Sequence, residues 1–283
     1  MNQSGLLILI AVVLVCLLLG DTLLRRAGYR NHTIKRKPTV PMSSPSIPYA
    51  ELLKQLQPPT VPAEKLERLT AERQGMIYPR YLILDLQTTG LSILQGKEDH
   101  IVQAAWLGLD DQYRELCHGV VLVEQSNAGS DEARRVHHLD THTLRIMGKS
   151  EEELLELLLP LIKRSSVLVC HNVRFDLSIL LGAIRRLHPT AEFWLKHKEA
   201  ICTMVLSAAL DPHWRHHYRS LTSLTNEYTG ISPADMDAFD ITGWRNVCLT
   251  RICLAQLRLR YPDETEPGDL PIVEDYLDQR VGP

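Results

Sequence analysis

Two short apolar stretches, each followed by polar residues, constrain the fold of this chain more than any other feature of its sequence. The first covers residues 81–86 and lies between Pro79 and the turn residues 88–90. The second covers residues 166–170 and precedes an amphipathic pattern over residues 174–187. Short apolar runs between turn residues predict buried strands, and a 3.6-residue period predicts a helix. We therefore expect an α/β fold.

Other segments continue this alternation. Strands are predicted over residues 100–109 and 116–123, and a helix over residues 151–163, where Ser150 and Glu153 occupy the positions of a capping box. Three strands followed by helix, strand and helix predict an α/β sandwich around a mixed sheet. Further helices are predicted over residues 199–210, 219–229 and 244–259.

Composition excludes several classes of protein. The chain is 45% hydrophobic and 23% charged, as ordinary globular proteins are, which excludes a wholly disordered, collagen-like or multi-spanning chain. Its net charge of −3 creates no global basic field of the kind that marks many nucleic-acid binders. The six cysteines form no C-x-x-C pair, so we expect buried thiols rather than disulfides or a zinc ribbon.

A membrane anchor is predicted at the N-terminus. Residues 6–19 are all apolar, and their flanks extend the run over residues 5–24, close to the about 20 residues that cross a bilayer. No Lys or Arg precedes the run, whereas residues 25–37 hold six basic side chains and no acidic one. Because basic flanks stay in the cytoplasm, we expect a single-pass anchor at residues 1–24 with the C-terminal domain cytoplasmic. A cleaved signal peptide is the alternative.

The remaining chain divides into a linker, a domain and a tail. Residues 25–77 are first basic and then rich in proline, which favours an extended spacer with short helical pieces at residues 49–57 and 63–74. A globular domain is expected over residues 78–260. Residues 261–283 carry seven acidic side chains and one Arg, which predicts a solvated acidic tail. Docking of this tail onto a basic partner is the alternative.

Two motifs follow the predicted strands. Residues 85–91 have the sequence DLQTTGL, and residues 171–176 have the sequence HNVRFD. In this order and spacing, over about residues 78–258, they resemble the D-x-E-T-T-G-L and H-N-x-x-F-D motifs of the DnaQ-like (DEDDh) 3′–5′ exonucleases. The resemblance implies an RNase H-like fold, a mixed five-stranded sheet flanked by helices, here preceded by a single N-terminal transmembrane helix. It also implies contacts with 3′ ends of single-stranded nucleic acid from Thr88, Thr89, Gly90, Leu91, His171, Asn172 and Phe175.

The resemblance further implies phosphodiester hydrolysis by two metal ions, Mg²⁺ or Mn²⁺. Such ions lie about 3.5–4 Å apart, hold the attacking and leaving oxygens, and prefer hard oxygen ligands. Asp85 and Asp176 occupy two of the family's four acidic positions, so they are the expected catalytic residues and metal ligands. Asp85 and residue 87 lie on one face of the first strand because side chains alternate along it.

Three other family positions hold uncharged residues. Gln87 replaces a Glu, and residues 241–246 best match the family's H-x-A-x-x-D motif, with Ile241 in place of the general base and Asn246 in place of the last acid. Cys202 also stands where relatives carry an acid. At an effective dielectric constant of about 20, a charge pair at about 4 Å contributes about 4 kcal/mol, so losing two carboxylates weakens the binding of two dications. A missing base typically lowers the rate about 10²–10⁴-fold. We therefore expect very low activity.

Neighbouring residues offer substitutes for these groups. Asp235, Asp237 and Asp240 could supply a displaced acid, although Asp240 is better placed to cap a helix. Residues 211–219 hold three His, two Arg, a Trp and a Tyr, and could stack bases, bind phosphate, or supply a base or a metal ligand. A loop surface without a ligand is the favoured interpretation of this cluster.

The remaining histidines have simpler interpretations. His137, His138 and His142 lie close together in sequence, but this segment resembles the part of the family that runs along the substrate groove, so a metal site is disfavoured. His171 is expected to orient its neighbours rather than act as a base, and Phe175 is expected in the core.

Three functions stay open. The favoured one is a membrane-anchored, exonuclease-like protein that acts on or binds nucleic acid, with catalysis weakened or lost. The second is an active metal-dependent 3′–5′ exonuclease that uses Asp85, Asp176 and a displaced acid. The third is a protein-interaction scaffold. The expected partners are single strands with 3′ ends, the membrane through residues 5–24, and an unidentified protein.

Overall fold

A mixed five-stranded sheet forms the centre of the domain in the computed structural model, which describes residues 78–94, 98–210, 218–236 and 242–279. The strand order is β3-β2-β1-β4-β5. β1 pairs antiparallel with β2 and parallel with β4, which confirms the predicted mixed α/β sheet. The strands are β1 (Tyr81–Thr88), β2 (Ile101–Leu109), β3 (Glu115–Leu122), β4 (Val167–Cys170) and β5 (Glu199–Cys202).

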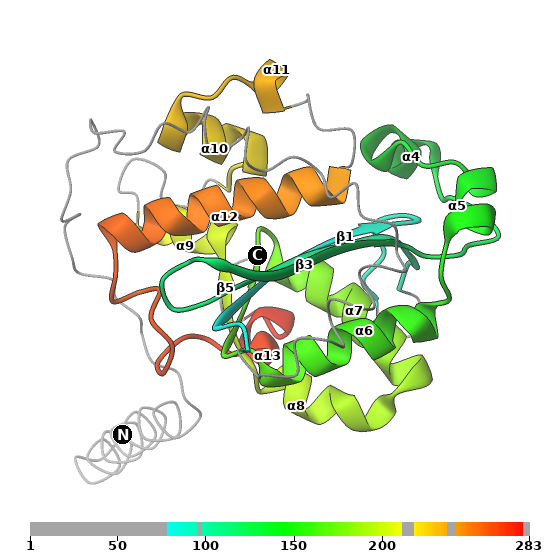
Figure 1. Ribbon diagram of the computed structural model, residues 1–283, viewed down its shortest axis with the longest axis horizontal. Helices are drawn as coiled ribbons and strands as arrows, with labels where there is room; N and C mark the ends of the chain where they lie inside the picture. The colour runs from blue at the N-terminus through cyan, green and yellow to red at the C-terminus, as the bar shows by residue number, and fades with distance from the viewer. Residues whose placement is uncertain (1–77, 95–97, 211–217, 237–241, 280–283) are drawn as a thin grey trace, which may run out of the picture. The chain divides into compact units, whose positions relative to one another are not determined.

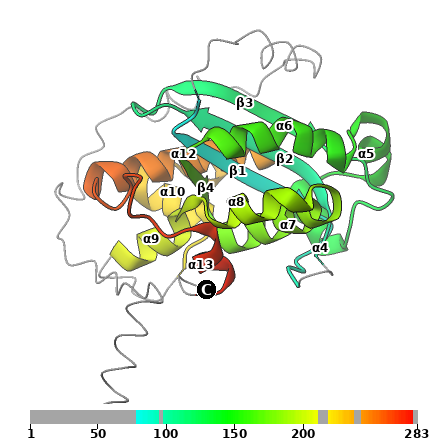
Figure 2. The same ribbon diagram turned by 90° about the horizontal axis from the view of Figure 1, so that it is seen from below.

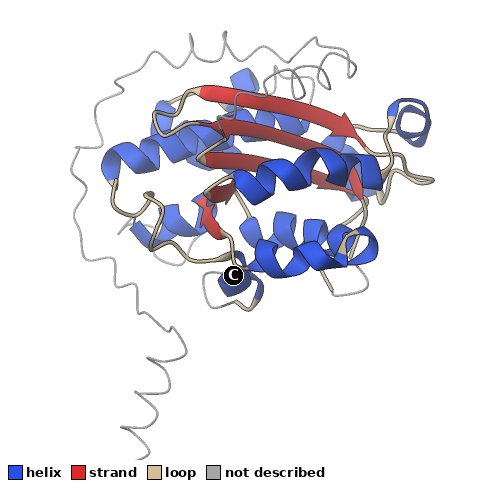
Figure 3. Ribbon diagram, turned by 60° about the horizontal axis from the view of Figure 1, so that its bottom comes forward, coloured by secondary structure: helices blue, strands red, loops and turns tan. Residues whose placement is uncertain are grey.

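Helices cover both faces of the sheet (Figures 1 and 3). One face carries α12 (Thr242–Arg260), with α9 (Thr203–Leu210), α10 (Leu221–Thr229) and α11 (Pro233–Met236) on the same side. The opposite face, which is nearest the viewer in Figure 2, carries α6 (Glu151–Arg164), α7 (Val173–Leu187), α8 (Glu192–Lys196) and α13 (Val273–Leu277). The 3₁₀ turn η1 (Pro189–Ala191) precedes α8. At the end of the sheet where β1 finishes lie α4 (Asp131–His137) and α5 (Thr141–Met147).

Side chains of β1 alternate between the two helix layers. Leu82 and Leu84 are buried with residues of α6 and α7, whereas Tyr81 and Ile83 are buried with residues of α12. A strand whose two faces are both covered has no polar face, so its sequence is almost continuously apolar. Burial on both faces explains the almost continuous apolar run of residues 81–86, which is the pattern that predicts a strand.

β5 corrects one prediction. The patterns predict a single helix over residues 199–210, but the structure has the four-residue strand β5 followed by α9. β5 pairs in parallel with β4 along its whole length. Periodicity cannot distinguish a four-residue apolar strand from the first turn of a buried helix, so the neighbouring strand decides. This strand completes the five-stranded sheet that the family resemblance implies.

The C-terminal segment corrects a second prediction. Residues 261–279, which we name the C-terminal strap, pack against the domain instead of forming a solvated tail. Thr265 and Val273 are fully buried, and Tyr276 is nearly so. The strap is acidic overall, so its composition does not indicate that a few of its side chains are buried. These buried side chains hold the strap against the domain.

Several predictions concern residues outside the described part of the chain. These are the anchor at residues 1–24, the linker, residues 211–217 of the His-rich cluster, Asp237, Asp240 and Ile241. Across residues 78–279, apart from the undescribed gaps, no helix combines the length and apolarity needed to span a bilayer. Four of the five described cysteines are buried, and all five are free thiols, as expected.

The capping box of α6 gives a test of the fold. The Ser150 hydroxyl accepts the Glu153 backbone N–H at 3.1 Å, and the Glu153 carboxylate accepts the Ser150 N–H at 2.8 Å. Ser150→Ala should lower the free energy of unfolding by about 1 kcal/mol, measured by chemical denaturation, because one N–H at the helix start loses its partner. Ser166→Ala, at an exposed position, is the control. An equal loss in both variants would contradict this capping role.

Candidate functional site

Asp85 and Gln87 start the site from the end of β1. They point to the same side of the strand because side chains alternate, and that side faces α12. The Gln87 Nε2 donates a hydrogen bond to the Asp85 Oδ2 at 2.6 Å. The predicted juxtaposition of positions 85 and 87 is therefore present, but an amide group stands where a second carboxylate would lie in the family.

Asn246 adds the second amide from the first turns of α12. Its Nδ2 donates to the other Asp85 oxygen, Oδ1, at 3.1 Å. The start of α12 is fixed by Gln103 of β2, whose Oε1 accepts the Gly243 backbone N–H at 2.8 Å. A Cβ at Gly243 would lie 2.6 Å from this Oε1, so only glycine permits the close approach. The geometry brings Asn246 to Asp85, as the matching of residues 241–246 to the third motif requires.

Asp176 reaches the site from the first turn of α7. The pairing of β1 with β4 ends at Ile83 and Val169, so the Leu86 N–H lies beyond the last pair of the β1–β4 ladder. The Asp176 Oδ1 accepts this N–H at 3.0 Å. The Asp176 side chain thus lies beside the same part of β1 that carries Asp85 and Gln87.

Burial makes ionisation of both carboxyl groups unfavourable. Burial raises the pKa of Asp85 to about 6, against the lowering effects of its hydrogen bonds from Gln87 and Asn246. Burial, and then the nearby charge of Asp85, raise the pKa of Asp176 well above its ordinary value. Each of the two carboxyl groups is therefore harder to ionise than an exposed carboxyl group would be.

The residues present do not fit the pair of metal ions that the fold family implies. Both Asp85 oxygens already accept N–H groups, and the two amides direct nitrogen rather than oxygen at the point where an ion would share ligands. Among the described residues, no group of three or more His, Cys, Asp or Glu side chains is placed to hold a metal. Asp235, a predicted substitute, accepts the Ser232 hydroxyl at 2.6 Å in the first turn of α11.

Asp99 holds the turn that follows β1 by hydrogen bonds, whereas Leu91 of this turn is exposed to solvent. The Thr89 hydroxyl donates to Asp99 Oδ1 at 3.0 Å, and the Ser92 N–H donates to Asp99 Oδ2 at 2.6 Å. A Cβ at Gly90 would meet the same carboxylate at 2.6 Å. The side chain of Leu91 is 81% exposed at the tip of this turn. The turn thus presents an apolar side chain on a fixed backbone.

Thr88, the last residue of β1, is buried, and its hydroxyl donates to the Gly90 carbonyl at 2.5 Å. The hydroxyl groups of Thr88 and Thr89 thus each have a partner within the protein. Contacts of Thr88, Thr89 and Gly90 with nucleic acid stay predictions.

His171 joins three segments around the start of α7. Its Nε2 lies 2.9 Å from the Arg219 carbonyl, which can only accept, so this nitrogen carries the proton. Its Nδ1 then accepts the Thr203 hydroxyl at 2.9 Å. Burial lowers the pKa of His171 to about 4. With both nitrogens occupied and the ring neutral, His171 orients its neighbours and is not placed to act as a base.

The two other residues of this motif have structural contacts too. The Asn172 side chain caps α7 by accepting the Phe175 N–H at 3.4 Å, and Phe175 packs partly buried against the core. Contacts of either residue with nucleic acid stay predictions.

Two further sequence interpretations concern single side chains. Both ring nitrogens of His137 engage the backbone: Nε2 lies 3.2 Å from the Ala128 carbonyl, and Nδ1 accepts the Leu139 N–H at 3.0 Å. The Cys202 thiol, in the place of a family acid, donates to the His171 carbonyl at 3.1 Å.

Gln103 and Asp99 are the site residues that sequence reasoning missed. Gln103 is the one polar side chain between Ile101 and Leu109, and a lone polar residue in a buried strand must have a partner. That signal was available, although the partner, Gly243, lies 140 residues away. Asp99 shows no comparable signal because acidic residues are common in exposed loops.

The protonation of His171 predicts a pH effect on stability. Its folded pKa of about 4 lies below the ordinary value of 6.5, so between these values the unfolded chain binds a proton that the folded chain does not. Stability should therefore fall as the pH drops from 7 to 5, by about 1–2 kcal/mol more in the wild type than in His171→Asn. Denaturation at both pH values measures this difference. Parallel pH profiles of the two proteins would contradict the buried, neutral state of His171.

Comparisons with known proteins agree with this fold. The sequence model of the RNase_T family, described as Exonuclease, matches residues 82–237, whereas no curated protein shows a significant match. E. coli exonuclease I in complex with a dA16 oligonucleotide has a TM-score of 0.51 and 15% identity, covering 70% of this chain and 43% of that one.

The zinc-bound form of the E. coli exonuclease I complex with single-stranded DNA has a TM-score of 0.54 and 19% identity, covering 72% of this chain and 43% of that one. The chain thus spans less than half of these structures. The family match covers more than half of the 283 residues, so this chain belongs to the RNase_T family of exonucleases.

Proposed function

We propose that this protein binds single-stranded nucleic acid through an exonuclease domain whose metal-dependent cleavage is weakened or lost. One observation carries the proposal: both oxygens of the Asp85 carboxylate accept N–H groups from Gln87 and Asn246. Hydrogen bonding by these amides takes the place of the positive charge that metal ions would supply. The family membership supports an exonuclease-like function, and the donor set argues against hydrolysis by two ions.

The electrostatics of the site favour this conclusion over an active enzyme. Two carboxyl groups face a site that would need to balance four positive charges, and burial disfavours ionisation of both. At an effective dielectric constant of about 20, each missing carboxylate about 4 Å from an ion removes about 4 kcal/mol of attraction. His171 is also not available as a general base, because both of its ring nitrogens are already hydrogen-bonded.

Binding of nucleic acid is supported by what survives around the site. The structures of E. coli exonuclease I contain oligonucleotides, and this chain shares their fold. The exposed side chain of Leu91 stands on the turn that follows β1, which Asp99 holds by hydrogen bonds, and it could make apolar contact with a base. We further propose that residues 5–24 hold the protein in a membrane, with the domain in the cytoplasm.

Restoring the carboxylates should restore metal binding. Gln87→Glu with Asn246→Asp removes both amide donors from Asp85 and adds two negative charges, so Mn²⁺ affinity should rise at least about tenfold in calorimetric titrations. Adding Ile241→His should bring measurable cleavage of a labelled 3′ end, because a general base is then present. The control is the triple variant with Asp85→Ala, which should neither bind Mn²⁺ nor cleave. A triple variant without either gain would contradict the assignment of residues 241–246 to the third motif.

Binding of single strands should not depend on metal. The full-length wild type should bind a single-stranded oligonucleotide equally well with Mg²⁺ and with a chelator, measured by fluorescence anisotropy, because both Asp85 oxygens accept amide N–H groups instead of binding an ion. Affinity should fall as salt rises, since basic side chains that bind phosphates displace counterions from the nucleic acid. No binding at low salt would instead favour the scaffold function.

A further inference from the structure

The C-terminal strap covers an otherwise open edge of the sheet. β5 is the last strand on its side, so its outward N–H and C=O groups have no neighbouring strand in the sheet. Such an edge normally needs protection. The Ala200 N–H donates to the Pro271 carbonyl at 2.8 Å, and the Val273 N–H donates to the Lys198 carbonyl at 2.9 Å. Residues 271–273 thereby act as a short additional strand.

Tyr276 completes this edge with its side chain. The hydroxyl donates to the Ala200 carbonyl at 3.2 Å and accepts the Cys202 N–H at 3.3 Å. Backbone groups on the same side of a strand recur every second residue, so these bonds continue the row that Pro271 and Val273 begin. The buried ring of Tyr276 therefore replaces the part of a sixth strand that the strap does not reach.

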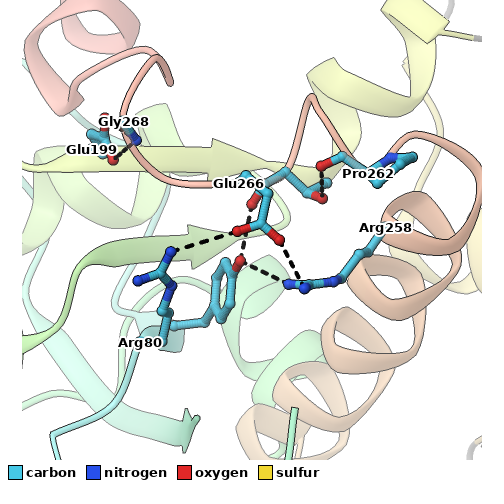
Figure 4. Close-up of polar contacts among 8 residues, drawn as sticks. Arg80, Glu199, Arg258, Pro262, Glu266 and Gly268 are labelled. Atoms are coloured by element: carbon cyan, nitrogen blue, oxygen red, sulfur yellow. Dashed lines mark hydrogen bonds and ion pairs between the residues drawn. The ribbon is translucent and has the colours of Figure 1, made fainter. Parts of the chain in front are cut away.

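Charged contacts fix the other end of the strap (Figure 4). The Glu266 carboxylate lies 3.5 Å from the Arg80 guanidinium and 2.7 Å from that of Arg258. The Tyr81 hydroxyl donates to the Thr265 carbonyl at 3.1 Å. Further along, the Gly268 N–H lies 2.9 Å from the Glu199 carboxylate at the start of β5. The strap is thus attached at both ends of β5.

The end of β5 is in turn joined to the functional site. The Cys202 thiol and the Met204 N–H both donate to the His171 carbonyl, at 3.1 and 3.2 Å. The Thr203 hydroxyl donates to the His171 ring. His171 lies in the turn that begins α7, and α7 carries Asp176. A continuous set of hydrogen bonds therefore runs from Tyr276 to the turn that places Asp176.

We propose that Tyr276 is a positioning residue, which holds the end of β5 and thereby the His171 turn of the nucleic-acid site. The role in binding depends on the function proposed above, whereas the mechanical role does not. The strap lies outside residues 82–237, the part of the chain that the family model matches.

Hydrogen–deuterium exchange of the full-length protein tests the proposal. Tyr276→Phe keeps the buried ring and removes the hydroxyl, so amide exchange should rise about tenfold in residues 199–204 and also in residues 169–176. The matched control is Tyr261→Phe, which removes a hydroxyl bonded to the Leu210 carbonyl in α9, and it should leave both segments unchanged. Oligonucleotide affinity should fall about threefold to tenfold in Tyr276→Phe alone.

The outcomes separate the proposals. Faster exchange confined to residues 199–204 would show that the strap only shields an edge, and it would overturn the positioning role. Unchanged exchange in both segments would overturn it too. If the wild type binds no oligonucleotide, the proposed function fails, while the exchange pattern still decides the role of Tyr276. Should Tyr276→Phe be unfolded by circular dichroism, Glu266→Gln, which loosens the strap at Arg80 and Arg258, provides the same measurement.

Discussion

The hydrogen bonds that Asp85 accepts from Gln87 and Asn246 determine how the rest of the site can behave. A buried carboxylate requires either a cation or several donors, because burial of an unpaired charge is costly. In this protein the donors are two uncharged side chains of the same chain, one on β1 and one on α12. They join the strand to the helix without any ion. The two hydrogen bonds make this site a polar contact between strand and helix, which is the basis of the proposed binding function.

This arrangement has a consequence for stability. Four carboxylates gathered in one buried site repel one another unless metal ions are bound, and active sites often carry such a cost. Replacing two of them by amides removes repulsion and adds hydrogen bonds to Asp85. Burial still raises the pKa of both remaining carboxyl groups, and the nearby charge of Asp85 raises that of Asp176 further. Under the proposed function, these two amides would stabilise Asp85 where a relative relies on metal ions.

Much of the sheet and its helices could be predicted because local patterns and burial agree. β1, β2, β3 and β4 follow apolar runs, and α6 follows a capping box that the structure contains. The two motifs also predicted that Asp85, Gln87 and Asp176 would gather. The sequence patterns did not predict α4 and α5, seven-residue helices that begin at the caps Ser130 and Asp140, because helices so short carry little periodicity.

The remaining features depend on contacts between distant residues. β5 is a strand only because β4 lies on one side and the strap on the other, more than 60 residues later. The cap of α12 comes from Gln103, in a different element. The strap has an acidic composition, yet a minority of its side chains, among them Thr265, Val273 and Tyr276, decides where it lies. These contacts join segments that are far apart in the sequence: backbone groups of β5 and α12 find their hydrogen-bond partners in other elements. Patterns within one segment do not reveal such partners.

Crystals grown with Mn²⁺ would show directly whether this site binds metal ions, through anomalous scattering at the manganese edge. We expect no pair of anomalous peaks beside Asp85 and Asp176, with the side chains of Gln87 and Asn246 still directed at the Asp85 carboxylate. Two peaks about 3.5–4 Å apart that share Asp85 as a ligand would contradict this expectation, because the site would then hold the ions that two-metal hydrolysis requires.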